Sequence, residues 1–270
     1  MAYVENNGTR LWYKVSGEGE PLVLTGGYLL LHRQFDWIVD LLAKDFQVIN
    51  WNYRGAGHSD RFWAGGYSLD RYVDDLEIIL DSLNLQEVNL WGTSTGSTVT
   101  MRYTAKYQKR VKSMISYCMI RTAAYRKAFD SFVSIGENFG FDALAQFLGW
   151  IGVAECNQFS EIQNRIALHE AEAMKEVVSL ESLAKTAETF SHIDLTSELK
   201  KITVPTLLLM GDSSMVGLKN PLVAELAQEF HDCCPHRQTA TIRDTGGTFC
   251  MYEKPEETAE AVKKFITSLA

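Results

Sequence analysis

Short, nearly continuous apolar runs alternate along most of the chain with segments whose apolar residues recur at helical spacing. Such runs are typical of strands covered on both faces of a parallel sheet, and they occupy residues 22–24, 46–51, 88–91, 114–117 and 206–210. Between them, residues 36–42 and 68–83 place apolar side chains on one helical stripe. This alternation predicts an α/β domain built on a mostly parallel sheet.

The two ends of the chain extend this pattern. Residues 3–5 and 11–15 flank the turn pair Asn7-Gly8 and predict a hairpin that leads into the first parallel strand. Near the other end we expect a helix at 222–229, a strand at 239–243 and a last helix at 255–269. Pro255 suits a helix start, where its missing N–H costs no hydrogen bond.

The middle of the chain differs, because residues 122–194 contain helical patterns and no convincing strand. A helical insertion of this kind predicts a cap over an α/β core. We therefore expect residues 1–121 to form the first part of the core, residues 122–195 the cap, and residues 196–270 the second part of the core.

Charge and hydropathy exclude two classes of partner. The 26 Lys and Arg residues against 34 Asp and Glu give a formal charge of -8, which disfavours nucleic acid. No apolar run approaches the ~18 residues of a membrane helix, and the start of the chain lacks a secretory signal pattern. We expect a cytoplasmic protein whose partner is a small-molecule ligand or substrate.

Cysteine usage indicates neither disulfides nor a metal. The five cysteines are scattered, and only Cys233 and Cys234 are close in sequence, without the two-residue gap that lets a pair bind one ion. The sequence therefore predicts no metal and no cofactor.

The most informative stretch runs from Val88 to Ser97, where a predicted strand leads through Gly92-Thr93-Ser94-Thr95-Gly96 into a predicted helix. This G-x-S-x-G in a strand-turn-helix context is the pattern of a nucleophile elbow. Its glycines allow a close crossing of strand and helix, and the strained turn lifts the serine hydroxyl into a pocket. Ser94 is therefore the candidate nucleophile.

With this elbow, the chain resembles the α/β-hydrolase fold family over nearly its whole length. The segment 24–28 stands where the family has His-Gly-x, and residues 52–60 resemble its D-x-R-G-x-G-x-S-D loop. The resemblance implies an eight-stranded, mostly parallel sheet with flanking helices and a helical cap. It also assigns an oxyanion hole to the backbone N–H groups of Gly27 and Thr95.

The bulky residues that follow the presumed oxyanion loop are candidates for ligand contact. Tyr28 and Leu29 begin an apolar run in a loop, which predicts packing against the cap, a wall for an apolar ligand, or both. Thr93, directly before the nucleophile, is a third candidate ligand-binding residue.

The two other members of a serine triad are not where the family pattern puts them. The acid position of the G-x-x-D pattern is Ser214, and Asp212, a possible displaced acid, comes two residues early, a shift of ~6 Å along a strand. Gly247 stands at the histidine position, and no histidine follows His236. A similar G-D-x-x stretch and glycine pair occur in the NDR (N-myc downstream-regulated) family, regarded as non-catalytic, although the first hundred residues look more like ordinary hydrolases.

The leading hypothesis from these substitutions is a degenerate triad, because loss of the histidine costs about 10⁶ in turnover. The chain would then show little or no ester hydrolysis and would bind a small apolar or carbonyl-containing ligand, or carry a non-hydrolytic activity. The alternative is an active serine hydrolase of esterase or lactonase type with a displaced base such as His32, or else His169 or His192. A third explanation, a histidine replaced to trap substrate, is disfavoured because the acid position is lost as well.

Overall fold

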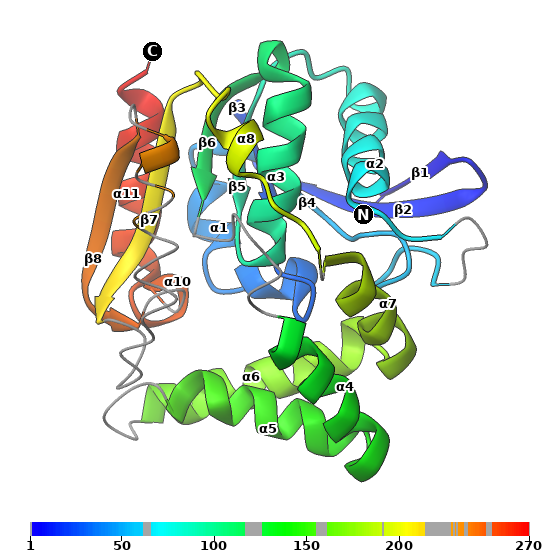
Figure 1. Cartoon of the computed structure of the whole chain (residues 1–270). Helices are drawn as coiled ribbons and strands as arrows, with labels where there is room; N and C mark the ends of the chain where they lie inside the picture. The colour runs from blue at the N-terminus through cyan, green and yellow to red at the C-terminus, as the bar shows by residue number, and fades with distance from the viewer. Residues whose placement is uncertain are drawn as a thin grey trace.

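A computed structural model describes residues 2–61, 66–116, 126–154, 161–190, 192–213, 228, 230, 232–234, 237–246 and 250–269. Its centre is one eight-stranded sheet of order β1-β2-β4-β3-β5-β6-β7-β8, in which β2 pairs antiparallel with β1 and β4 and all other pairs are parallel (Figure 1). The strands are β1 (Ala2–Asn6), β2 (Thr9–Ser16), β3 (Glu20–Thr25), β4 (Phe46–Trp51), β5 (Val88–Gly92), β6 (Val111–Ser116), β7 (Thr206–Ser213) and β8 (Gln238–Gly246). The predicted α/β-hydrolase fold is confirmed.

The parallel strands are buried on both faces, as their uninterrupted apolar runs predict. In β3, Val23 packs into a cluster with the helices on one side, whereas Leu22 and Leu24 pack into a second cluster on the other, and all three are fully buried. The sheet is therefore the middle layer of three, with α2 (Leu69–Ser82) and α3 (Thr95–Lys106) on one face and α1 (Val39–Leu42) and α11 (Pro255–Thr267) on the other (Figure 1).

Local signals explain where the helices begin. Ser68 caps α2, since its hydroxyl accepts a hydrogen bond from the Arg71 N–H, and Pro255 opens α11. The predicted helix at 36–42 differs: the chain forms a short 3₁₀ helix, η1 (Leu31–Phe35), before α1. Two further short elements, η2 (Gln108–Arg110) and α8 (Thr196–Leu199), precede β6 and β7.

Two predicted strand ends were placed too early. β7 continues to Ser213 and β8 to Gly246, where the sequence pattern ended them at Met210 and Arg243. The residues beyond Met210 and Arg243 are small or polar and carry no apolar run, but pairing with the neighbouring strand extends both strands. Asp212 therefore lies within β7 and not in a turn.

Four consecutive helices form a layer beyond the carboxyl ends of the strands (Figure 1). They are α4 (Arg126–Phe139), α5 (Phe141–Ala154), α6 (Glu161–Val177) and α7 (Leu180–Phe190), and they lie between β6 and β7 in the chain. Hydrogen bonds join this layer to loops of the core: among them, the Tyr28 hydroxyl donates to the Ser182 carbonyl at 3.0 Å, and the Gly57 N–H to the Val177 carbonyl at 2.7 Å. The helices thus cover the end of the sheet at which Ser94 lies.

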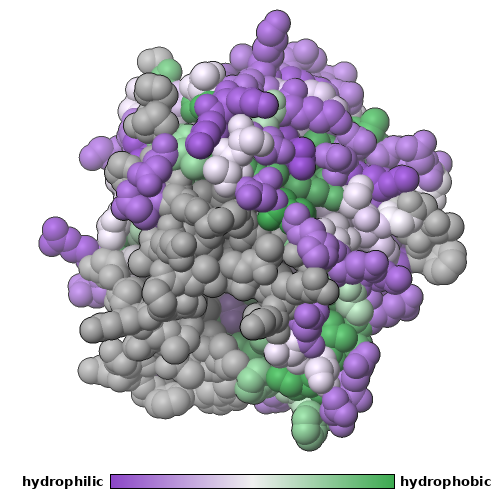
Figure 2. All heavy atoms as spheres, viewed as in Figure 1, coloured by the Kyte–Doolittle hydropathy of each residue, from purple (hydrophilic) through white to green (hydrophobic). Residues whose placement is uncertain are grey.

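The described surface in Figure 2 is mostly hydrophilic, and hydrophobic residues form separate patches on that face. Phe139 of α4 and Phe147 of α5 are among the exposed large apolar side chains, at 76% and 42% exposure. Within the described residues, no helix has both the length and the apolar character to cross a bilayer.

Candidate active site

Ser94 occupies a strained turn between β5 and α3. Its backbone has φ 51° and ψ -127°, a left-handed conformation that disfavours any residue with a Cβ atom. The strain is imposed by the strand on one side and the helix on the other, which is the geometry of a nucleophile elbow. The predicted strand-turn-helix around Ser94 is present.

Both glycines of the elbow are required by close packing. A Cβ atom on Gly96 would lie 2.0 Å from the Thr25 carbonyl oxygen of β3, and one on Gly92 would lie 2.4 Å from the Thr100 hydroxyl oxygen of α3. Neither position can accept a side chain without separating the helix from the sheet. The two glycines therefore fix the close crossing that produces the Ser94 conformation.

The Ser94 hydroxyl lies beside the loop that follows β3. A Cβ atom on Gly27 would be 3.0 Å from the Ser94 Cβ and 3.4 Å from its Oγ, so the loop packs directly against Ser94 and a side chain at position 27 would crowd the hydroxyl. Ser94 is only partly buried, and among the described residues its side chain makes no hydrogen bond. Among the described residues, the hydroxyl is therefore not held by a structural partner.

The buried Gln34 side chain joins the oxyanion loop to the elbow. Its Oε1 accepts hydrogen bonds from the Gly27 N–H at 2.6 Å and from the Thr93 hydroxyl at 2.7 Å. The Gly27 N–H is therefore engaged internally in this structure, and its role in an oxyanion hole, which the family resemblance implies, stays a prediction. Sequence analysis missed Gln34, because it follows His32 and Arg33 and nothing local marks it as the buried member of this polar run.

Tyr28 and Thr95 form a second link between the same two segments. The Tyr28 N–H donates to the Thr95 Oγ1 at 2.7 Å, and both residues are buried. The Thr95 N–H, at the first position of α3, has no acceptor in the described part of the chain. It therefore keeps the free donor that the family resemblance assigns to it.

The predicted ligand-contact residues are mostly packed within the protein. Tyr28 is 2% exposed, and burial raises the pKa of its hydroxyl, which is bonded to α7, to about 12. Leu29 is partly buried against the main core cluster, and Thr93 is 1% exposed. Only Leu29 of the three presents a partly exposed side chain.

The positions expected for the acid and the histidine follow the ends of β7 and β8. Ser214 and Gly247 lie outside the described residues, as does the side chain of Asp212. The strands before them end together, since Ser213 of β7 pairs with Gly246 of β8. The described parts of β7 and β8 therefore end at the same level of the sheet.

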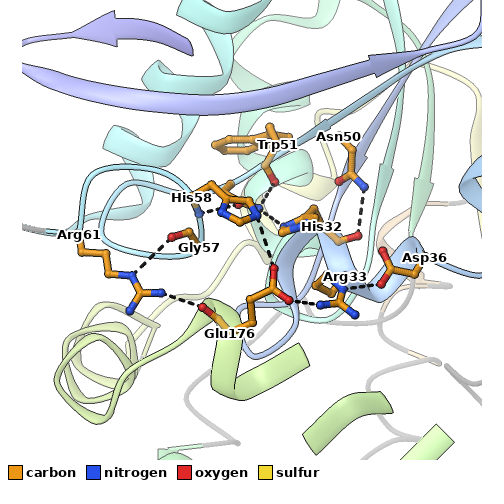
Figure 3. Close-up of polar contacts among 10 residues, drawn as sticks. His32, Arg33, Asp36, Asn50, Trp51, Gly57, His58, Arg61 and Glu176 are labelled. Carbon is orange, nitrogen blue, oxygen red and sulfur yellow. Dashed lines mark hydrogen bonds and ion pairs between the residues drawn. The ribbon is translucent and has the colours of Figure 1, made fainter. Parts of the chain in front are cut away.

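His32, the suggested displaced base, lies in a separate cluster (Figure 3). Its Nδ1 accepts a hydrogen bond from the Asn52 Nδ2 at 2.9 Å, and its ring lies 4.6 Å from Trp12 and 5.0 Å from His58, centroid to centroid. Burial, followed by the charge of His58, lowers the pKa of His32 to about 3. No hydrogen bond joins it to Ser94 among the described residues, and so weak a base is poorly suited to accept the serine proton.

His169 of α6 lies against η1 and α10 (Cys250–Glu253). Its Nε2 lies 3.2 Å from the Arg33 carbonyl oxygen, which can only accept, so this nitrogen carries a proton. The Asp36 Oδ2 is 3.8 Å from the same nitrogen, and the ring lies 5.8 Å from that of Tyr252 in α10. A neutral His169 therefore has its lone pair on Nδ1, with the other nitrogen oriented by a carbonyl and a carboxylate.

The other histidines lie on the surface or outside the described residues. His192 is exposed and lines a groove between α4 and α7 with Asp130 and Glu188. His231 and His236 lie outside the described residues.

Three side chains approach one another in a way that resembles a metal site. One ligand atom from each of His32, His58 and Glu176 lies within 4.8 Å of the others. However, Asn52 holds the lone pair of the His32 Nδ1, so in this neutral ring the Nε2 carries the proton, and Arg33 pairs with Glu176 (Figure 3). In this arrangement the cluster lacks a full set of free ligands.

The described cysteines are Cys233, Cys234 and Cys250, all buried and none in a disulfide. Burial raises the pKa of the Cys250 thiol to about 11, so it remains protonated near neutral pH. Cys250 is a packing residue and not a nucleophile.

A mixed, mostly parallel sheet with a strained serine at the elbow between a central strand and its helix defines a class of proteins, the α/β hydrolases. The sequence profile of the alpha/beta hydrolase fold family matches residues 20–152. The chain belongs to the α/β-hydrolase fold superfamily.

Curated relatives and solved structures agree with this assignment. The chain is 26% identical to a cis-3-alkyl-4-alkyloxetan-2-one decarboxylase of Shewanella oneidensis over 98% of this chain and 87% of that enzyme. It is 28% identical to a non-heme chloroperoxidase of Kitasatospora aureofaciens over 78% of this chain and 80% of that one. The enol-lactonase of Burkholderia xenovorans superposes with a TM-score of 0.82 at 20% identity, covering 98% of this chain and 100% of that structure.

These relatives overturn the leading hypothesis of a protein with little or no hydrolytic activity. They are named as enzymes, and they match most of the present chain. The hypothesis rested on two loop positions assigned by spacing alone, whereas loops can supply catalytic side chains from several places. The prediction of a non-catalytic protein was wrong, and the hydrolase alternative is the better supported.

Proposed function

We propose that the protein is a serine hydrolase that cleaves a small ester or lactone, with Ser94 as the nucleophile. The observation that carries this proposal is the strained backbone of Ser94, with φ 51°, next to Gly27, which brings no side chain close to the Ser94 hydroxyl. Strain of this kind costs of order 1–3 kcal/mol and persists at positions where it serves a reaction.

The substrate class follows from the elbow and from the relatives. A serine alkoxide attacks a carbonyl carbon, and a helix N-terminus with a free N–H stabilises the oxyanion that forms. Three relatives carry names of cyclic esters: an oxetan-2-one, an enol-lactone and an N-acyl homoserine lactone. We place the substrate between the elbow and the helices α4–α7, which act as the cap predicted at residues 122–195, with Leu29 as a contact.

We propose His169, and not His32, as the base that takes the Ser94 proton. Two observations support this assignment. A neutral His169 has its lone pair on Nδ1. Its ring also lies beside Tyr252, which is five residues after Gly247, the position at which the family pattern puts the catalytic histidine. Asp36 would then orient the imidazole, as an acid does in a serine triad. Burial raises the pKa of the neighbouring Glu170 to about 8, so that group is mostly protonated at neutral pH and does not compete for this role.

Intact mass after exposure to a fluorophosphonate tests the nucleophile. We expect the parent protein to gain one label and Ser94→Ala to gain none. Ser97→Ala is the matched control, because the Ser97 hydroxyl lies in the same turn but donates to the Gly92 carbonyl at 2.8 Å, and it should label like the parent. A parent that stays unlabelled over hours would refute the proposed function.

The base is tested by the rate of the same labelling reaction and by hydrolysis of p-nitrophenyl acetate. His169→Ala should slow both by at least about 10²-fold, while His32→Ala and His192→Ala keep the parent rate. If His169→Ala reacted at the same rate as the parent, His169 would not be the base, whereas the assignment of Ser94 as the nucleophile would be unaffected.

A further inference from the structure

Most hydrogen-bond donors around Ser94 are already used within the protein. The Gly27 N–H and the Thr93 hydroxyl both donate to Gln34 Oε1, and the Tyr28 N–H donates to the Thr95 hydroxyl oxygen. A substrate oxygen beside Ser94 can take none of these three without breaking an internal bond.

Thr95 has two donors left. Its backbone N–H, at the first position of α3, has no acceptor among the described residues, and it lies at the positive end of the helix dipole. Its hydroxyl oxygen is held by the Tyr28 N–H, so the hydroxyl proton must point away from Tyr28, and it too meets no acceptor in the part of the chain described. The side chain is 1% exposed, so its position is fixed by packing.

The family resemblance already assigns the Thr95 backbone N–H to the oxyanion hole. We propose that the Thr95 side-chain hydroxyl is its second donor, and that the Tyr28 N–H acts by positioning that hydroxyl. This inference rests on the proposed function. It replaces the usual second backbone donor by a hydroxyl whose oxygen is already polarised by an N–H, so the proton it presents is a stronger donor.

The step balances as an ordinary acyl transfer. The Ser94 Oγ forms a bond to the carbonyl carbon, its proton passes to the base, and the carbonyl π pair moves onto the oxygen, where the two Thr95 donors stabilise the charge. On collapse the bond to the alcohol or ring oxygen breaks, and the base returns the proton to that leaving oxygen. Water then repeats the sequence to release the acid.

The alternative is that the Tyr28 N–H, and not the Thr95 hydroxyl, donates to the substrate oxygen. If the Thr95 hydroxyl only satisfies the Tyr28 N–H until substrate displaces it, removing the hydroxyl frees that N–H and leaves catalysis equal or faster. The two roles therefore predict opposite changes in kcat when the Thr95 hydroxyl is removed.

Thr95→Val removes the hydroxyl at nearly constant shape, and Thr95→Ser keeps it. We expect Thr95→Val to lower kcat for p-nitrophenyl acetate by 10- to 10³-fold with KM within about threefold, as loss of an oxyanion donor does. Thr95→Ser should recover most of the rate. Thr104→Val, which removes a hydroxyl bonded to the Thr100 carbonyl further along α3, is the control and should match the parent. A parent or higher kcat in Thr95→Val would overturn the proposal.

A binding experiment tests the role of Thr95 even if the protein proves not to be a hydrolase, because binding needs no catalysis. Butyrate is titrated into ¹⁵N-labelled Ser94→Ala protein and into the double variant with Thr95→Val. We expect saturable shifts of the Thr95 amide, with an affinity several-fold weaker in the double variant. Equal affinity in the two proteins, or no shift at the Thr95 amide, would overturn the role of Thr95 even if the parent were inactive.

Discussion

At the scale of single residues, the positive φ of Ser94 lowers the stability of the protein but holds the serine in the elbow conformation. Ser94→Gly should raise the free energy of unfolding by about 1–3 kcal/mol, since glycine adopts positive φ without strain. Ser94→Ala keeps a Cβ atom and should gain little. Urea unfolding of the three proteins measures the difference, and equal gains in both variants would show that the serine side chain, and not its backbone, is the source of the strain.

His32 makes the stability of the protein depend on pH. Its pKa falls from an unfolded value near 6.5 to about 3, so the unfolded chain binds the proton first as pH falls. Stability should therefore drop between pH 6.5 and pH 3, by of order 1–3 kcal/mol at pH 4 relative to pH 7. His32→Gln, which can still accept the Asn52 hydrogen bond, should show a smaller drop in urea titrations, and the exposed His192→Gln should follow the parent. A parent-like pH slope in His32→Gln would contradict this assignment.

At the scale of elements, the crossing of β3, β5 and α3 decides whether the elbow forms. Gly96→Ala places a Cβ atom 2.0 Å from the Thr25 carbonyl oxygen, a contact between backbone groups that cannot move apart cheaply. We expect a loss of at least about 3 kcal/mol or no folded protein. Gly140→Ala, at φ 89° with open space around it, isolates the cost of the backbone conformation alone and should lose only about 1–2 kcal/mol. Circular dichroism melting compares the two, and similar losses would mean that the crossing is less tight than the structure shows.

The elements that sequence analysis predicted well are those with dense local signals. The continuous apolar runs gave the parallel strands, and the stripe at 68–83 gave α2, because burial on both faces of a sheet or on one face of a helix leaves a fixed spacing. The strand ends at Ser213 and Gly246 were missed, since pairing across the sheet, which no local pattern records, extends β7 and β8.

The site was predicted in part for the same reason. Ser94 and its glycines lie within five consecutive residues, so their spacing carried the prediction. The engagement of the Gly27 N–H by Gln34, and the enclosure of His32 by Asn52 and Trp12, depend on segments brought together only by the fold. Spacing alone could not show which donors and which imidazole remain free.

At the scale of the whole molecule, Glu176 is one of several residues that join the helical layer to the core (Figure 3). Glu176, near the end of α6, pairs through its carboxylate with Arg33 and lies 3.5 Å from the His58 Nε2, and its carbonyl accepts a hydrogen bond from Arg61 at 2.7 Å. Since these contacts link α6 to loops beside the elbow, movement of the layer over Ser94 has to strain or break them.

Glu176→Gln should therefore loosen the helical layer without unfolding the sheet. The lost ion pairs are partly exposed, so we expect only about 0.2–1 kcal/mol, less at high salt. Amide hydrogen exchange should quicken in α6 and α7 and remain unchanged in β3 to β6. Glu172→Gln, an exposed site on the same helix with no ion pair among the described residues, is the control. If exchange quickened equally in both variants, or in the sheet as well, the attachment of the layer through Glu176 would have to be abandoned.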